Sequence, residues 1–473
     1  MRRFSMTIPV IIFLALYLIA MLLIGYIAMK RIKSVEDMYV GGKNIGGVLT
    51  ALSFFTTYFS SVVFVGATAL GWRYGLPIVW KDVFVVLIGT LFAFIFLGGR
   101  LACLSKTLRF SSVVEFIEKR YRSRIAGLIA SVVMFVGLLI YVVSILVGMV
   151  RAVEVVADID YSLALILITI VTAIYTAMGG YVAQVWTQAA QAVFMIVMAL
   201  TICAASLLKV GGLSMLYQQL KSIDLSLAGW PYRDILPLFS LYLSLGFLGW
   251  GNPALLLRFI SVRNRISLRT ATVVATTLVA IFTLSLNIAS AATRLVVSND
   301  VKPDHAFVYL VKFLFPQGFD IVFLIAVISA SMSTITALLS VMTQCVKGLI
   351  GVRKMPTHRF EVIFYRVTTM VLALISMVLA LKPPEMVIAL FGTTTSILAG
   401  VLTGPVIYGL YSRKVTASAV GITMVISFVL AISISAYGGF KAPWTYYSFI
   451  PTIISSLALP PIASKVEIIK QRM

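Results

Sequence analysis

Long apolar stretches alternate with short polar connections along almost the whole chain. Each stretch is close to the roughly 20 residues that an α-helix needs to cross the hydrocarbon core of a bilayer. This pattern predicts an all-α integral membrane protein with about thirteen transmembrane helices. The predicted spans cover residues 8–28, 49–71, 83–103, 126–149, 163–178, 181–208, 236–259, 271–292, 322–346, 363–381, 386–411, 417–436 and 446–462.

The composition agrees with a lipid environment. Hydrophobic residues make up 61% of the 473 residues, charged residues make up 11%, and the mean hydropathy is +1.06. A soluble domain could not bury so much apolar surface. Cys103, Cys203 and Cys345 fall inside apolar stretches, so we interpret them as packing residues and expect no disulfide framework. The first stretch continues into Lys30 and Arg31 without a small-residue cleavage site, so we expect no cleavable signal peptide.

The basic residues lie mainly in the short connections. A net charge of +22 would suggest nucleic-acid binding in a soluble protein. In a membrane protein it indicates topology and contact with anionic lipid, so we expect no nucleic-acid partner. Most of the 38 Lys and Arg residues fall on one side when the N-terminus is placed outside, and an odd number of spans then puts the C-terminus inside. Arg2 and Arg3 oppose this N-out, C-in orientation.

The second predicted span, residues 49–71, has an unusual polar centre. Its hydroxyl groups come from Thr56, Thr57, Tyr58, Ser60 and Ser61, with no charge among them. At membrane depth, hydroxyls and freed carbonyls are tolerated only where they face protein or a water-filled cavity. The segment is therefore suited to binding a small alkali cation and a polar solute.

The seventh predicted span contains three glycines and a proline in the sequence GFLGWGNP, residues 246–253. We expect this cluster to unwind the helix and free its carbonyls. Interrupted segments at matching positions of two halves are typical of transporters built from inverted repeats, and the two unusual spans lie five spans apart. A kinked helix with packing glycines is the alternative interpretation.

A second hydroxyl cluster lies in the ninth predicted span, where Ser329, Ser333 and Thr336 recur on one helix face. Such residues commonly bond back to their own helix or mediate helix packing. Two clusters in one chain nevertheless favour a site for Na⁺, a hard cation that prefers oxygen ligands. Neutral oxygens hold it without a buried carboxylate, which would cost on the order of 2.5–3.5 kcal/mol, and we identify no acid at a bilayer midplane.

Six further motifs carry a family resemblance. They are EDMYVGGK at 36–43, SVVEFIEKRYRSR at 112–124, GGYVAQVWTQAAQ at 179–191, GNPALLLRF at 251–259, ASMST at 330–334 and GP at 404–405. In this order and at these topological positions, the chain resembles the solute:sodium symporter family, which includes proline and pantothenate permeases and sodium–glucose cotransporters. The motif TTYFSSVVFVG at 56–66 is most similar to the pantothenate-permease branch.

The resemblance implies a LeuT-type fold with ten core helices in two inverted five-helix halves. We expect an extra helix and loop over residues 1–44, the first repeat over 45–212, the second repeat over 213–412, and two C-terminal helices with a short tail over 413–473. The implied Na⁺ ligands are the carbonyls of Thr56, Phe59 and Ala330 and the hydroxyls of Ser333 and Thr334. This set replaces Ser329 and Thr336 of the helix-face argument.

One position departs from the family pattern. After Trp186-Thr187 the family commonly has an aspartate associated with sodium-dependent transport, whereas this chain has Gln188. A neutral glutamine there could weaken Na⁺ binding on its exit path or alter coupling. The oxygen cage is intact, so we expect sodium coupling, with proton-coupled or uncoupled uptake in the same fold as the alternative.

For the solute, we predict binding by polar and aromatic side chains that line the same cavity. The candidates are Tyr58, Ser60, Ser61, Asp82, Tyr141, Trp250, Asn252 and Thr394. Helix packing is the alternative for each. Lys81 would favour a carboxylate solute if it faced the cavity, although such a pair with Asp82 often marks the membrane interface. We expect Arg258 to snorkel to the cytoplasmic face.

Together these features predict a plasma-membrane secondary transporter that carries a small carboxylate or amino acid with Na⁺ as the coupling ion. An intramembrane enzyme would need His, Asp or Cys constellations at membrane depth, but His305 and His358 lie in predicted loops. A transporter-like sensor is a remote alternative, because the tail after Ile462 is too short for the usual soluble extension.

Overall fold

The computed structural model describes residues 2–29, 34–178, 180–229, 234–298, 300–352, 357–382 and 387–472. These ranges are almost entirely helical. They contain no β-strand, only one isolated parallel bridge between Ile45 and Val262. The predicted all-α class is therefore confirmed for this part of the chain.

Three elements precede the first half of the core, which ends with the long helix α10 (Tyr181–Val210). The leading elements are α1 (Arg2–Met29), α2 (Val35–Val40) and η1 (Gly41–Lys43). The first half then comprises α3 (Gly47–Tyr58), η2 (Val62–Ala67), α4 (Thr68–Tyr74), η3 (Leu76–Val79), α5 (Trp80–Val83), η4 (Phe84–Gly98), α6 (Gly99–Thr107), α7 (Val113–Tyr121), α8 (Arg124–Ala157), α9 (Tyr161–Met178) and α10 (Tyr181–Val210).

Two short helices, α11 (Leu213–Ile223) and α12 (Leu225–Ala228), connect to the second half. It comprises α13 (Ile235–Gly251), α14 (Pro253–Ser261), α15 (Arg265–Val296), α16 (Pro303–Leu314), α17 (Phe319–Ile350), α18 (His358–Ala380), α19 (Val387–Thr395), η5 (Ser396–Val401) and α20 (Leu402–Tyr411). The chain ends with α21 (Ala417–Tyr437), α22 (Trp444–Tyr447) and α23 (Phe449–Arg472).

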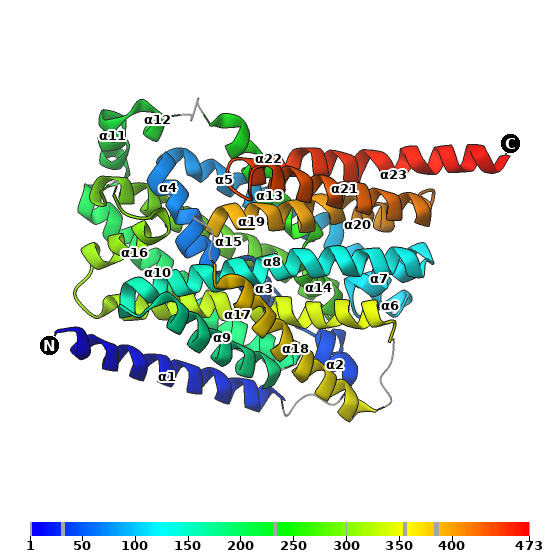
Figure 1. Ribbon diagram of the computed structural model, residues 1–473, viewed down its shortest axis with the longest axis horizontal. Helices are drawn as coiled ribbons and strands as arrows, with labels where there is room; N and C mark the ends of the chain where they lie inside the picture. Colours follow the sequence, from blue (N-terminus) through cyan, green and yellow to red (C-terminus); the bar gives the residue numbers. More distant parts are fainter. Residues whose placement is uncertain are drawn as a thin grey trace.

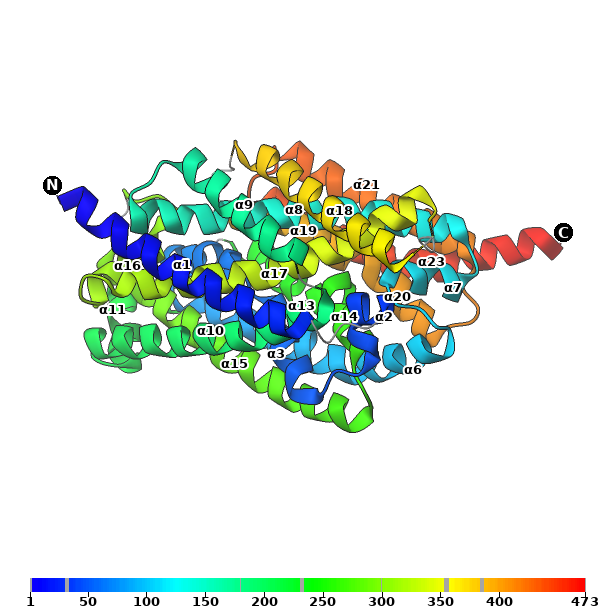
Figure 2. The same cartoon turned by 90° about the horizontal axis from the view of Figure 1, so that it is seen from below.

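Helix α17 lies at the centre of the molecule and contacts α3, α8 and α10. Its most apolar window is 94% buried inside the protein, as is that of the segment Val387–Tyr411. Helix α1 runs along one edge beside α10, and α21 and α23 pair along the opposite edge (Figure 1). The start of α1 and the end of α23 lie at opposite ends of the long axis, as the view from below also shows (Figure 2).

Every predicted span falls on apolar helix. Ten described helices are long and apolar enough to cross a membrane, one further candidate is a bent pair, and two shorter apolar helices cover Ala15–Ile24 and Tyr161–Ala177. Several helices extend past the predicted ends, because polar caps continue them beyond the apolar region: Ser123 caps α8 and Asn264 caps α15. Lys30, Arg31, Gly179 and Met386 lie outside the described residues.

Both predicted helix interruptions occur. Between α3 and α4 the chain leaves the helix at Phe59, and the two parts are bent by 54°. Between α13 and α14 only Asn252 leaves the helix, with φ −70° and ψ 114°. The glycines before it stay inside α13, so the expected unwinding across the whole cluster is wrong. These glycines instead allow close helix contact, because a Cβ on Gly249 would lie 1.9 Å from the carbonyl oxygen of Gly89.

Asp304, near the start of α16, is a buried carboxyl outside the candidate membrane spans. Its Oδ2 accepts a hydrogen bond of 3.1 Å from the backbone N–H of Val387, at the start of α19. Burial raises the pKa of Asp304 from 3.8 to about 7, against the lowering effects of the Val387 N–H and of Arg151. The folded protein keeps this proton to a higher pH than the unfolded chain does. Its stability therefore falls as the pH rises from about 4 to about 7.

We expect the Asp304→Asn variant to lose this pH dependence, because asparagine keeps an oxygen acceptor for Val387 but does not ionise. Its thermal midpoint in detergent should exceed that of the wild type by a few °C at pH 8. That advantage should shrink steadily toward pH 5. Melting curves followed by intrinsic fluorescence between pH 5 and pH 8 check this, and an advantage that is constant across the range would show that Asp304 does not titrate there.

Candidate functional site

The interruption after α3 frees backbone carbonyls in the middle of the protein. Phe59 has extended geometry, with φ −115° and ψ 134°, so the regular helical pairing of the preceding turn ends there. The carbonyl oxygens of Thr56 and Phe59 accept hydrogen bonds from side chains of α17 rather than from their own helix. The break thus creates acceptors that another helix must satisfy.

Ser333 and Thr334 of α17 supply hydroxyls to these carbonyls. Ser333 Oγ lies 2.9 Å from the Thr56 oxygen and 2.7 Å from the Ala330 oxygen. Thr334 Oγ1 lies 3.1 Å from the Thr56 oxygen, 3.0 Å from the Phe59 oxygen and 3.0 Å from the Ala330 oxygen. The structure therefore brings together all five predicted cation-ligand residues around one point.

The other two hydroxyls of the predicted α17 face take different partners. Ser329 Oγ donates to the hydroxyl of Tyr17 on α1 at 2.9 Å. Thr336 Oγ1 bonds back to its own helix, at 2.8 Å from the Met332 oxygen and 3.0 Å from the Ser333 oxygen. A shared helix face was thus not sufficient to identify the cation ligands, because the break in α3 contacts only one turn of α17.

The five-residue cluster suits a small hard cation. It offers three carbonyl and two hydroxyl oxygens, and each of its residues is at most 3% exposed. No carboxylate contributes, which avoids the cost of a charged side chain at membrane depth. Among the described residues no group of three or more His, Cys, Asp or Glu could hold a metal ion, so transition-metal chemistry has no ligand set there.

Gln188 of α10 lies next to this cluster and joins it to α3. Its Nε2 donates to the Ser333 carbonyl at 2.8 Å and to Thr57 Oγ1 at 3.3 Å. Its Oε1 accepts from Ser53 Oγ at 2.6 Å. Gln188 is completely buried. The residue that departs from the family pattern is therefore a neutral cross-link between three helices, one hydrogen bond away from a proposed cation ligand.

Arg258 of α14 does not snorkel to the cytoplasmic face, and that expectation is wrong. The residue is 1% exposed and lies beneath the break in α3. Its Nη2 donates to Thr57 Oγ1 at 2.9 Å, and its guanidinium lies 4.8 Å from the ring centre of Tyr181. When the side-chain amide of Gln184 is turned so that its oxygen faces donors, this oxygen accepts a hydrogen bond from the same Nη2 at 3.2 Å. The short helix after Asn252 turns Arg258 inward, away from lipid and water.

Three predicted solute residues carry buried polar atoms that have no hydrogen-bond partner within the described residues. They are Tyr141 Oη on α8, Asn252 Nδ2 at the second break and Thr394 Oγ1 on α19. The Tyr141 ring packs against Phe391, one turn before Thr394, with ring centres 4.8 Å apart. Buried polar groups normally have partners, so these atoms are available to bind a polar solute.

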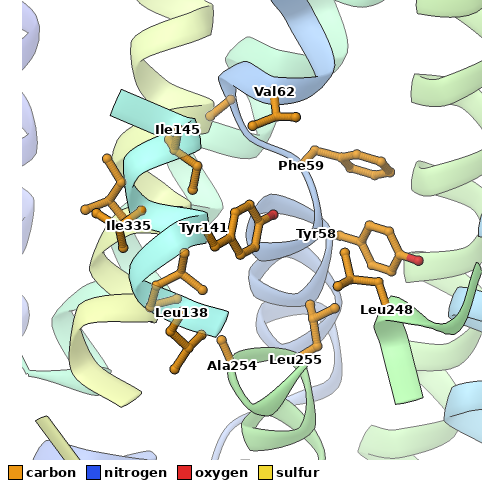
Figure 3. Close-up of a cluster of buried hydrophobic side chains, with 14 of the residues drawn as sticks. Tyr58, Phe59, Val62, Leu138, Tyr141, Ile145, Leu248, Ala254, Leu255 and Ile335 are labelled. Carbon is orange, nitrogen blue, oxygen red and sulfur yellow. The ribbon is translucent and has the colours of Figure 1, made fainter. Parts of the chain in front are cut away.

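Four other predicted solute residues are occupied by packing. Tyr58 Oη donates to the Leu245 carbonyl at 2.6 Å and points toward α13, away from Tyr141 (Figure 3). Ser61 Oγ donates to the Ile145 carbonyl at 2.7 Å. Trp250 Nε1 donates to the Ile88 carbonyl at 2.8 Å, and Ser60 Oγ accepts from the Val62 N–H at 3.3 Å. The polar atoms of Tyr58, Ser61 and Trp250 thus join different helices, and the Ser60 hydroxyl stabilises the break itself.

Asp82, the remaining candidate, belongs to a separate buried group. Its Oδ1 lies 3.5 Å from Lys81 Nζ and accepts from Asn287 Nδ2 at 2.6 Å. Lys81 Nζ in turn donates to Asn287 Oδ1 at 3.2 Å. Lys81 and Asp82 are both at least 97% buried. The pair therefore ties α5 to α15 inside the protein.

Sequence reasoning missed three residues around the site. Tyr17 of α1 accepts from Ser329 and from Gln191, at 2.9 Å and 3.0 Å. Gln184 and Tyr181 surround Arg258. A lone tyrosine in an apolar span has no distinguishing local pattern. Gln184, Gln188 and Gln191, however, recur at helical spacing in α10, and three amides on one transmembrane face would have indicated a buried polar seam.

Comparisons with known proteins identify the family of this chain. The sequence model of the sodium:solute symporter family matches residues 38–426. The sodium/pantothenate symporter of Escherichia coli is 27% identical over 446 residues, which is 90% of each protein. An osmoregulated proline transporter of Bacillus subtilis is 24% identical and covers 98% of this chain and 95% of its own length. The sodium/proline symporter of Salmonella typhimurium is 24% identical over 91% of this chain and 88% of its own length.

Solved structures show the same architecture. The substrate-bound, outward-open state of a Na⁺-coupled sialic acid symporter superposes with a TM-score of 0.82 at 20% identity, covering 97% of both chains. The nucleobase-cation symporter MHP1 in a closed conformation superposes with a TM-score of 0.60 at 13% identity, covering 93% of this chain and 96% of that one. The LeuT-type fold is therefore confirmed, and the apolar helices belong to a multi-pass plasma-membrane protein.

Proposed function

The chain belongs to the sodium:solute symporter family, and we propose that it imports a small organic solute together with Na⁺ by alternating access. The observation that carries this proposal is the meeting of three backbone carbonyls and two hydroxyls where broken α3 meets α17. The protein is a transporter rather than an enzyme. No bond of the solute has to be made or broken.

In this proposal Na⁺ is a transported substrate held by Thr56, Phe59, Ala330, Ser333 and Thr334. Its binding joins α3 to α17, because two of the carbonyls belong to the first helix and the third carbonyl and both hydroxyls belong to the second. A cation that bridges two helices stabilises the arrangement in which both contribute ligands. Gln188 would then sense the state of the site through its bond to the Ser333 carbonyl.

For the solute we propose Tyr141, Asn252 and Thr394 as direct ligands, because their polar atoms are buried and unpaired in the described chain. Tyr58, Ser60, Ser61, Trp250 and Asp82 remain proposed ligands for another conformation of the cycle. The first and second repeats, proposed at 45–212 and 213–412, would place one broken helix each beside the solute. The N-out, C-in orientation is part of the same proposal.

The membrane potential can supply the energy for uptake against a concentration gradient. One charge that crosses a potential of 100 mV gains about 2.3 kcal/mol. At about 1.4 kcal/mol per tenfold change, this supports roughly fifty-fold accumulation of a neutral solute with one Na⁺. For a neutral solute, sodium coupling alone is thus sufficient for concentrative uptake. A monovalent anion carried with one Na⁺ moves no net charge, so its uptake would draw on the Na⁺ concentration gradient instead.

We expect purified protein in sealed vesicles to accumulate one class of small solute only when an inward Na⁺ gradient is present. The panel consists of pantothenate, short monocarboxylates, proline and sugars, and choline replaces Na⁺ in the control. We expect at least about tenfold more uptake with Na⁺, a change that corresponds to 1.4 kcal/mol of coupling. Uptake that ignores Na⁺ but follows an imposed pH gradient would establish the proton-coupled alternative, which Gln188 makes worth testing.

A further inference from the structure

Arg258 is a buried cation whose hydrogen-bonding and ring partners are all neutral. Thr57, Gln184 and the ring of Tyr181 are the groups that its guanidinium meets. Within the described residues its Nε and Nη1 have no hydrogen-bond partner, and no carboxylate lies within ion-pair distance. Arginine keeps its charge under all physiological conditions, so burial does not neutralise it.

A buried charge of this kind is costly unless it is paired. Two neutral amides lie beside it: Gln184, which accepts from Nη2, and Gln188, which shares the Thr57 hydroxyl with Arg258. Gln188 brings no charge, and its Nε2 donates toward Thr57 just as Arg258 does. The protein itself therefore leaves the positive charge of Arg258 uncompensated at the inner side of the proposed Na⁺ site.

A basic recess lies beyond Arg258, at the end of the molecule that we propose to be cytoplasmic. It has a volume of about 860 Å³. Five basic residues line it, against two acidic ones: Lys43, Lys106, Arg109, Arg263 and Lys347, with Glu36 and Glu115. Lys43 pairs with Glu36 and Lys347 pairs with Glu361, so the excess positive charge of the recess comes from Lys106, Arg109 and Arg263 and attracts anions.

Tyr181 is close to both Arg258 and the segment that borders this recess. Its ring contacts the guanidinium and lies near Gly41, and Gly42, the next residue, lines the recess. The Tyr181 hydroxyl is 2.7 Å from Ser261 Oγ, at the end of the helix that carries Arg258. Arg258 and the recess are thus linked through neighbouring residues of the fold.

We propose that the solute crosses this protein as a carboxylate anion, and that Arg258 is the counter-charge that its carboxylate meets on the inner half of its path. The inference rests on the proposed function and specifies the charge class of its solute. A guanidinium with free N–H groups matches the planar oxygens of a carboxylate. A zwitterion would bring a positive charge back to a region where Arg258 already lies and where we propose Na⁺, with no acidic partner for Arg258 among the described residues.

The anion also explains how Na⁺ can bind so close to a fixed cation. Thr56 offers its carbonyl to the proposed Na⁺ site, and the neighbouring Thr57 offers its hydroxyl to Arg258. The positive charges of Arg258 and Na⁺ repel each other at this separation. An anion close to both of them stabilises both. Coupling between ligands is reciprocal, so the carboxylate and Na⁺ each raise the affinity of the other.

The test compares carboxylates with their neutral amides as competitors of Na⁺-driven uptake by wild-type protein in vesicles. Lactate and propionate should compete at least about tenfold better than lactamide and propionamide, which is 1.4 kcal/mol or more of discrimination. The accumulated solute should itself be a carboxylate without an ammonium group. Na⁺-driven accumulation of proline or a sugar, equal competition by the amides, or no transport of any carboxylate would each overturn the anion assignment.

The Gln188→Glu variant tests the role of Arg258 directly, because it places a carboxylate beside the guanidinium. Gln188→Met is the matched variant, because it removes the hydrogen bonds of the amide to Ser53, Thr57 and Ser333 without adding a charge. We expect carboxylate uptake by Gln188→Glu to be at least about tenfold below uptake by Gln188→Met, after size-exclusion chromatography confirms that both variants fold. Equal uptake by the two variants would remove Arg258 from the path. Carboxylate uptake that no longer depends on Na⁺ would instead reject the sodium coupling of the proposed function.

Discussion

Changing Ser333 and Thr334 together to alanine is expected to abolish Na⁺-driven uptake. The double variant removes both hydroxyl ligands of the proposed cage and leaves only the carbonyls of Thr56, Phe59 and Ala330. A hydrogen bond or ligand contact to a charged group contributes roughly 1.5–3 kcal/mol. Loss of two such contacts should weaken Na⁺ binding by about a hundredfold or more.

The measurement is the Na⁺ concentration that gives half-maximal uptake, or half-maximal thermal stabilisation in detergent if uptake is lost entirely. Ser331→Ala is the matched control, because Ser331 is equally buried on the same helix and its hydroxyl only bonds back to the Val327 carbonyl at 2.7 Å. We expect wild-type Na⁺ dependence for this control. Unchanged Na⁺ dependence in the Ser333→Ala, Thr334→Ala variant would remove the proposed site.

Gly249→Ala is expected to have the largest effect on folding. A Cβ at this position would lie 1.9 Å from the carbonyl oxygen of Gly89 and 3.4 Å from the Cβ of Ala93. The obstacle is backbone, so it cannot rotate away, and α13 and η4 must separate. Overpacking typically costs 1–3 kcal/mol and more when the backbone has to move, so we expect most of the folded protein to be lost.

The yield of monodisperse protein in size-exclusion chromatography checks this expectation, together with the thermal midpoint of whatever folds. Gly46→Ala is the control, since a Cβ there meets nothing within 4 Å and Gly46 has φ −69°, which alanine adopts freely. The control should behave as wild type. A Gly249→Ala variant that is as stable as the control would show that α13 and η4 are not held at this distance.

The membrane environment and the family motifs were accessible from the sequence. Apolar stretches of bilayer length depend only on local composition, so each span could be located, although polar ends extend helices such as α8 and α23 well past the predicted bounds. The break at Asn252 also has a local cause, because Pro253 cannot donate to the preceding turn. The cation cluster came from matching short motifs, and the structure brings those residues together.

The first break has no such local cause. Phe59 and its neighbours contain neither glycine nor proline, yet the helix ends at Tyr58. The Thr334 hydroxyl, 275 residues away along the chain, stabilises the freed carbonyl of Phe59. A hydroxyl-rich sequence is compatible with an intact helix whose serines bond back to their own turns, and only the neighbouring helix selects the broken form.

The environment of the charged side chain of Arg258 could not be predicted from the sequence either. From the sequence, an arginine near the end of a span is expected to reach water along its flexible stem. Asn252 interrupts the span, and the short α14 that follows holds the guanidinium near Thr57 and Tyr181. Composition and periodicity thus determined that this chain is a multi-helix membrane protein with two polar interruptions. The partners of each polar group were decided only by the tertiary structure, because at membrane depth such groups must find partners on other helices, and those helices are far away in sequence.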